Sequence, residues 1–168
     1  MDLTGILLGT IHDPISYSII FFIYVILTVL FLPIPVEIGL FNPNIHPVLL
    51  IFILALGKGV GSAIAFEIGT RVRSAVKKKS IGTPLTKKIV AWCERFLMKY
   101  GYYGLFVIMS IPLMLDSVTV YLFSLLNPKD DGKRAMTRIW FVLINIVAGA
   151  VRGMIILLVA YLFSVRLV

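Results

Sequence analysis

Two short stretches of this sequence place an acid four residues after a proline, at the end of an apolar run or inside one. Residues 32–37 read LPIPVE and residues 111–116 read IPLMLD, so the acids are Glu37 and Asp116. Proline removes a backbone donor and breaks a helix. A carboxylate among apolar residues is costly and suggests a function. The pattern therefore predicts two broken helices that each carry a functional acid. The breaks are expected at Pro33, Pro35 and Pro112.

Two cations lie within the apolar segments and could pair with these acids. They are Lys58 and Arg152. Burial disfavours the ionised form of a carboxyl group and a nearby cation favours it, so an acid in this setting could gain and lose a proton. Broken helices that meet near the middle of a bilayer form the binding sites of many transporters. We therefore expect Glu37 and Asp116, with Lys58 and Arg152, to bind protons, cations or substrate in a transport cycle.

Other kinds of chemistry find little support in the sequence. His12 and His46 are isolated, and no His, Cys or carboxylate spacing resembles a metal site. The serines in the apolar segments have no convincing base beside them in sequence, and there is no phosphate-binding loop. We expect no enzyme activity, no cofactor and no metal.

Composition indicates an integral membrane protein with a single membrane domain, residues 1–168. The chain is 60% hydrophobic and only 14% charged, with a mean hydropathy of +1.01. Its net charge of +8 does not indicate nucleic-acid binding, because residues 1–57 contain no Lys or Arg and most basic residues lie in 71–99 and 129–138. Basic loops remain on the cytoplasmic side. A multi-pass protein of the plasma membrane is expected, with these loops in the cytoplasm.

Four apolar segments organise the chain: 16–32, 48–69, 105–126 and 139–165. Residues 70–100 between the second and third contain a basic loop and, from about residue 83, a pattern typical of an amphipathic helix at the membrane surface. Glycines spaced about one turn apart let two membrane helices approach closely. Faces for such packing are predicted at Gly57, Gly61, Gly69, Gly149 and Gly153.

The fold expected is an all-α polytopic membrane protein made of two inverted repeats, about 16–69 and 105–165. Each repeat is a proline-broken re-entrant hairpin followed by a transmembrane helix, and the amphipathic helix lies between the repeats. In the alternative topology all four segments cross the membrane completely and both termini lie inside. That alternative leaves the basic residues of 129–138 outside the cell. The positive-inside rule therefore favours the topology with two re-entrant hairpins.

These motifs resemble the DedA family of the VTT-domain superfamily, including its small multidrug export branch. The likeness rests on Pro33-x-Pro35-x-Glu37, on Gly57-x3-Gly61-x4-Phe66-x2-Gly69 and on Tyr100-Gly101 through Ile111-Pro112. It implies two facing re-entrant loops and either proton-linked transport or lipid flipping, with Glu37 as the acidic functional residue. Family members carry arginines around the second proline, whereas here Met109 and Leu115 flank it.

The sequence therefore favours a small DedA-like transporter coupled to protons or cations. The alternative is a flippase or scramblase for phospholipid or polyprenyl phosphate without ion coupling, and a third is an assembly factor. Expected partners are membrane lipids, protons or cations and an unidentified substrate, but not nucleic acid. A homo-oligomer formed through the glycine faces is left open.

Overall fold

The computed structural model describes most of the chain. The residues left undescribed are 1–4, 6, 8, 32, 33, 35, 79–94, 96–98, 114, 128, 131, 132, 135 and 163–168, and only the backbone is described at 73–78, 126, 129, 130, 133 and 134. The expected breaks at Pro33 and Pro35, and most of the expected amphipathic helix, lie outside the described residues.

The first described long helix, α2, runs from Pro14 to Leu30. Asp13 caps it, because its side chain accepts hydrogen bonds from Ile15 N at 3.2 Å and from Ser16 Oγ at 2.6 Å. The Ser16 hydroxyl, followed by the Ile15 amide, lowers the pKa of the Asp13 carboxyl below its usual value. The position of α2 agrees with the first apolar segment of the sequence, shifted by two residues.

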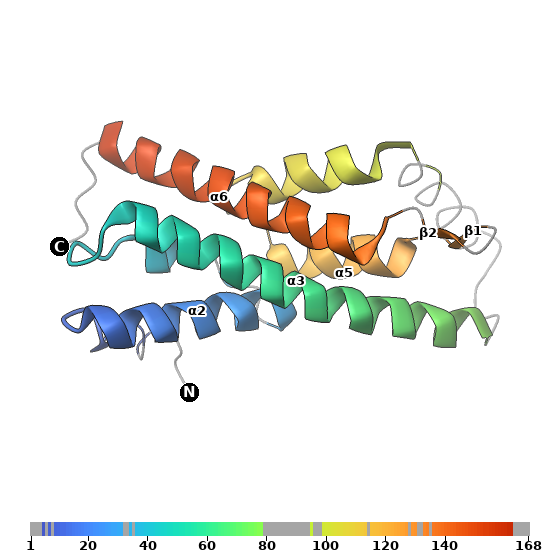
Figure 1. Ribbon diagram of the computed structural model, residues 1–168, viewed down its shortest axis with the longest axis horizontal. Coiled ribbons are helices and arrows are strands. Elements are labelled where there is room, and N and C mark those ends of the chain that lie inside the picture. The colour runs from blue at the N-terminus through green and yellow to red at the C-terminus, as the bar shows by residue number, and fades with distance from the viewer. Residues whose placement is uncertain are drawn as a thin grey trace.

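After α2 the chain turns back toward the end of the molecule from which that helix starts (Figure 1). It passes through the 3₁₀ helix η1, Val36–Leu40. Within η1, Gly39 O accepts a hydrogen bond from the Tyr17 hydroxyl at 3.0 Å. Asn44 Nδ2 then donates to Ile11 O at 3.0 Å. These contacts show that residue 44 has returned to the level at which α2 begins.

The longest helix, α3, covers Pro47–Lys78 and runs the length of the molecule (Figure 1). It continues beyond the apolar segment 48–69, so residues 70–78, which we expected to begin a basic loop, are helical. These nine residues contain no glycine or proline. Arg71 Nε also pairs with Glu67 Oε1 one turn earlier, at 3.1 Å, which supports the extension of the helix.

The third apolar segment is broken in the middle. Residues 99–110 are helical, the chain bends at 111–113, and α5 follows over Asp116–Leu126. Near the start of this segment the Tyr102 hydroxyl accepts from Thr137 N at 3.0 Å, and just after its end Asn127 Oδ1 accepts from Met136 N at 2.9 Å. Both ends therefore lie beside residues 136–137, and the segment turns back on itself (Figure 1).

A short ladder leads into the last helix. Strand β1, Lys129–Asp130, pairs antiparallel with β2, Lys133–Arg134, inside the region 129–138 expected as a basic loop. Helix α6 then runs from Arg138 to Leu162. The expectation of a helical fold is confirmed for the described residues, apart from this two-residue ladder. Two helices, Pro47–Val72 within α3 and α6, are long and apolar enough to cross a membrane.

Helix α3 lies at the centre of the fold and packs against α2, α5 and α6 (Figure 1). Glycines occupy the positions of closest approach. A Cβ atom on Gly57 or Gly61 would lie 2.8 Å from the Cβ of Val25 or Val29 on α2. On the remaining interfaces Gly69 adjoins Ser124, Gly149 adjoins Lys58 and Gly153 adjoins Ile51.

Candidate functional site

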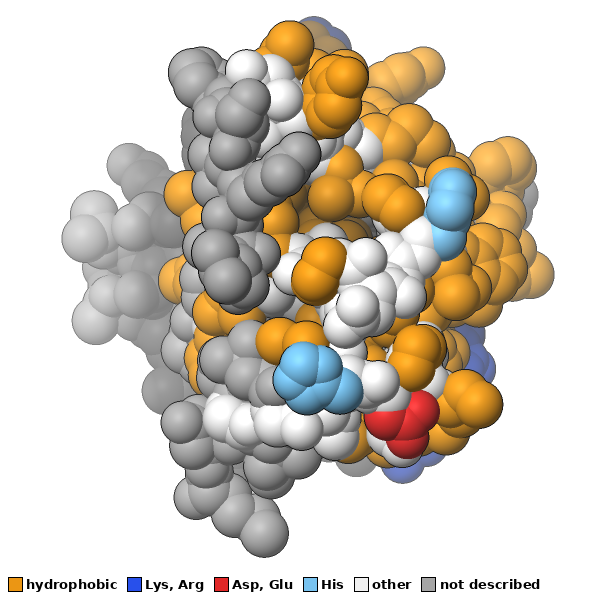
Figure 2. All heavy atoms as spheres, turned by 90° about the vertical axis from the view of Figure 1, so that its left-hand side faces the viewer, with side chains coloured by type: hydrophobic (Ala, Val, Ile, Leu, Met, Phe, Trp, Pro, Cys, Tyr) orange, Lys and Arg blue, Asp and Glu red, His pale blue; other side chains and the backbone are white. Residues whose placement is uncertain are grey.

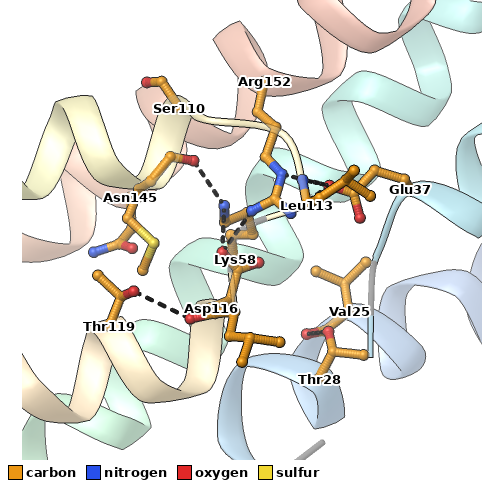
Figure 3. A network of polar contacts seen from close by, with 12 residues as sticks. Val25, Thr28, Glu37, Lys58, Ser110, Leu113, Asp116, Thr119, Asn145 and Arg152 are labelled. Atoms are coloured by element: carbon orange, nitrogen blue, oxygen red, sulfur yellow. Dashed lines mark hydrogen bonds and ion pairs between the residues drawn. The ribbon is translucent and has the colours of Figure 1, made fainter. Parts of the chain in front are cut away.

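Four charged side chains from four different elements meet inside the molecule (Figure 3). Glu37 comes from η1, Lys58 from α3, Asp116 from the first residue of α5 and Arg152 from α6. Lys58 and Arg152 are fully buried, and Glu37 and Asp116 are only 6% and 5% exposed. We call these four residues the charge cluster. It holds two carboxylates and two cations, so its net charge is zero when all four are ionised.

Arg152 joins the two acids. Its Nε donates to Glu37 Oε1 at 2.8 Å, and Nη2 donates to the same oxygen. Its Nη1 donates to Asp116 Oδ1 at 2.8 Å. The rigid, planar guanidinium suits this bridging position, because its donors point in fixed directions toward both carboxylates.

Lys58 supports the second acid and the break that precedes it. Its Nζ donates to Asp116 Oδ1 at 3.1 Å and to Met109 O at 3.3 Å. Met109 lies in the last turn of the helix that ends at residue 110, where backbone carbonyls lack partners within the helix. A cation at this helix end and an acid at the start of α5 are both favoured by the helix dipoles.

The bend after Pro112 contacts the first acid directly. Leu113 N donates to Glu37 Oε1 at 2.8 Å. Leu113 has a φ of 62°, a left-handed backbone conformation that is uncommon for residues other than glycine. This hydrogen bond ties the second broken segment to the acid of the first. Only the region of the bend was expected from the sequence, through Pro112, and not the contact that Leu113 makes.

Each carboxylate uses only one of its oxygens within the cluster. Glu37 Oε2 and Asp116 Oδ2 are buried and accept no hydrogen bond in the part of the chain that the structure describes. Asn145 Oδ1 on α6 is a third buried oxygen in this state. Buried polar atoms in proteins are nearly always hydrogen-bonded, so these three oxygens are unusual among the described residues.

The structure brings Glu37, Lys58, Asp116 and Arg152 together and places Pro112 at the nearby bend. Sequence reasoning missed the roles of Met109 O, Leu113 N and Asn145. The only available signal was Asn145, a polar residue seven positions before Arg152 and therefore on nearly the same face of a helix. Among the described residues, no group of three or more His, Cys, Asp or Glu side chains could hold a metal.

No known family model, no curated protein and no solved structure matches this chain. The resemblance to the DedA family therefore rests on the short sequence motifs alone.

Proposed function

We propose that this chain is a small membrane-embedded transporter, coupled to protons or cations, whose site is the charge cluster. One observation carries the proposal: a buried, neutral set of two acids and two cations joins the two proline-containing segments, and one oxygen of each acid is unpartnered. Ionisable groups inside a membrane protein are expensive and mark ion or substrate pathways.

Membrane insertion is supported by the surface of α3. From Val48 to Val72 every fourth residue is apolar and exposed, which forms an apolar stripe that winds slowly around the helix. The stripe spans about 36 Å, close to the roughly 30 Å thickness of the bilayer hydrocarbon. Lys58 and Arg152 lie within a few residues of the centres of the two apolar helices. A membrane around these helices would hold the charge cluster near its midplane. The stripe consists of Val48, Phe52, Leu56, Val60, Ile64, Ile68 and Val72.

Two features support inverted repeats with re-entrant hairpins. The segment containing α2 enters from one end of the molecule and the segment 99–126 from the other, and each is followed by one long apolar helix (Figure 1). Helix α5 has 11 residues and is about 17 Å long, too short to cross a bilayer alone. Each hairpin would then dip into the membrane, and their bends would meet at the charge cluster.

The distribution of charge supports an orientation for this arrangement. Figure 2 looks onto the end from which α2 starts, where histidine and acidic side chains lie among apolar and uncharged atoms. Residues 1–57 contain no Lys or Arg. The basic residues after Glu67 on α3 and those around β1 and β2 belong to the opposite end (Figure 1). By the positive-inside rule, that opposite end faces the cytoplasm.

The mechanism follows from the bridging position of Arg152. When both acids are ionised, the guanidinium holds together η1 and the start of α5, the elements that follow the two bends. A proton or another cation on Glu37 or Asp116 weakens that acid's attraction for Arg152 and leaves excess positive charge in the cluster. The bends can then separate on one side, which exposes the site to one face of the membrane. Ion binding thus selects between two arrangements of the same elements.

Proton flux in proteoliposomes tests this function. Vesicles holding the full chain and an enclosed pH-sensitive dye receive a pH step, and the rate of internal pH change is followed. We expect Glu37→Gln and Asp116→Asn to reduce the flux at least tenfold. Glu67→Gln, which alters a partly exposed acid on α3 that pairs with Arg71, is the matched control. Equal flux in all four proteins would refute the proposal.

The same vesicles distinguish the lipid-translocating alternative. Lysine and arginine side chains can bind the phosphate of a lipid, so the buried Lys58 and Arg152 favour lipid translocation. Both cations, however, already contact carboxylates. A scramblase would expose fluorescent phospholipid of the inner leaflet to dithionite added outside, without any ion gradient. We rank this function second and expect no bleaching beyond the outer leaflet.

A further inference from the structure

The atoms left without partners in and beside the charge cluster are all hydrogen-bond acceptors. They are Glu37 Oε2, Asp116 Oδ2 and Asn145 Oδ1. An unsatisfied buried acceptor retains the cost of its lost hydration, so each of these atoms favours a ligand that supplies a hydrogen-bond donor. Phosphate and other anions offer mainly acceptors and would not satisfy these atoms. The chemistry of the region therefore favours a ligand that donates and is positively charged.

Asn145 belongs to this region because of the way α6 packs on α3. A Cβ atom on Gly149, one turn after Asn145, would lie 2.9 Å from Lys58 Cδ, and one on Gly59 would lie 2.6 Å from Ile146 Cγ1. Asn145 is fully buried. Figure 3 shows its side chain on the side of Lys58 that faces away from Glu37. Asn145 thus belongs to the turn of α6 next to the one that packs on Lys58.

Lys58 shows which donor this environment accepts. Its wholly buried ammonium group is held by one carboxylate oxygen and one backbone carbonyl, Asp116 Oδ1 and Met109 O. A primary ammonium has three N–H donors and no acceptor. A ligand with the same group would donate hydrogen bonds to the unpartnered oxygens. In the ligand-free protein, Lys58 is the ammonium group that the cluster already holds.

Charge balance decides what must accompany such a ligand. The cluster is neutral, so a bound cation would leave one positive charge in excess where charge is costly. A guanidinium group does not lose its proton, whereas a buried lysine can. Loss of one proton from Lys58 restores neutrality. Among the described residues, the ionisable groups that interact electrostatically with Lys58 are Asp116, Arg152 and Glu37. Helix α2 has no charged residue, and its titratable side chains are Tyr17 and Tyr24.

We propose that the charge cluster binds one primary ammonium ligand in exchange for one proton from Lys58. The incoming R–NH₃⁺ donates to unpartnered oxygens of the cluster and of Asn145. One N–H bond of the Lys58 ammonium breaks, its electron pair stays on Nζ, and the proton leaves to water. Net charge is zero before and after the exchange. This inference rests on the proposed transport function and makes it an electroneutral exchange of amine for proton.

Isothermal titration calorimetry of the full chain in detergent tests the exchange, with methylammonium chloride as the probe at pH 7.5. Each titration is done in phosphate and in HEPES, which contain no primary amine and differ in ionisation enthalpy, so the difference in apparent heat counts the protons released. We expect one proton per bound cation. Asn145→Leu should weaken binding about tenfold and leave the proton count at one, because it removes one acceptor. Lys58→Arg should abolish proton release, because guanidinium does not deprotonate.

The wild-type protein alone can overturn the inference, so the result does not depend on whether a variant folds. Binding without proton release would refute the exchange. Equal heats from sodium chloride would refute selection for ammonium, and absence of any heat would refute the site. In each of these cases, proton flux in proteoliposomes that still depends on Glu37 would leave the proposed transport function standing. Loss of that dependence with intact ammonium binding would refute the transport function instead.

Discussion

Arg152 Nε donates to Glu37 Oε1 over 2.8 Å, although the two residues are 115 positions apart in the chain. The same guanidinium donates through Nη1 to Asp116 Oδ1 at 2.8 Å. One side chain of the last helix therefore holds the acids of both proline-containing segments. Its removal would change the net charge of the cluster from zero to minus one in a buried environment.

The first prediction concerns this bridge. Arg152→Gln should lower the free energy of unfolding by about 3–5 kcal/mol, because it leaves a buried carboxylate without its cation. Reversible unfolding in mixed micelles measures the change. The control is Arg71→Gln, which breaks an exposed pair with Glu67 one turn away and should cost less than about 1 kcal/mol.

A double variant makes this prediction more specific. Glu37→Gln combined with Arg152→Gln returns the cluster to neutrality, since Lys58 and Asp116 remain paired at 3.1 Å. The double variant should therefore be more stable than Arg152→Gln alone, which a double-mutant cycle quantifies. If the loss of stability in the double variant equals the sum of the losses in the two single variants, Glu37 and Arg152 do not interact.

The second prediction concerns the close contact of α2 with α3. Gly61→Ala would place a Cβ atom 2.8 Å from Val29 Cβ, and neither carbon can rotate away. The helices must then move apart, which should cost about 1–3 kcal/mol. Gly9→Ala is the control, because a Cβ atom there meets nothing within 4 Å. Thermal unfolding of both variants in the same detergent compares them, and equal midpoints would contradict this packing.

The third prediction concerns the bend after Pro112. Leu113 is 72% exposed and has a φ of 62°, so Leu113→Gly removes little packing and relieves about 1–2 kcal/mol of backbone strain. We expect unchanged or higher stability in micelle unfolding, and the amide that donates to Glu37 remains. Leu115→Gly is the control, because Leu115 has an ordinary φ of −73° and should lose stability. If Leu113→Gly lost as much stability as Leu115→Gly, this account of the bend would be contradicted.

The elements of the fold were largely predictable because hydrophobic periodicity and proline are local signals. Helix α2 and the start of α6 lie within two residues of the expected segments, and the break near Pro112 lies where proline predicts it. The C-terminal end of α3 was missed, because charged residues such as Arg71 are good helix formers and extend a helix beyond its apolar part. The ladder β1–β2 was missed because two residues give no alternating pattern.

The candidate site was predictable in its members but not in its connections. An acid or a cation within an apolar run is visible in the sequence, which gave Glu37, Lys58, Asp116 and Arg152. Nothing in their spacing indicates that Arg152 joins both acids, since such contacts depend on how distant helices pack. The amide of Leu113 is a backbone group and carries no sequence signal. The carboxamide of Asn145 became a candidate only once its oxygen was seen to lack a partner.

The last prediction concerns topology. His12 and His46 are both exposed, and Asn44 Nδ2 lies 3.0 Å from Ile11 O, so the two histidines belong to the same end of the molecule. Thr137 is exposed beside Tyr102 near the other end. With Cys93 changed to serine, single cysteines at 12 and 46 should react with an impermeant maleimide from one side of oriented vesicles, and a cysteine at 137 from the opposite side. Complete crossing by 16–32 would instead place positions 12 and 46 on opposite sides, and that result would rule out the first re-entrant hairpin.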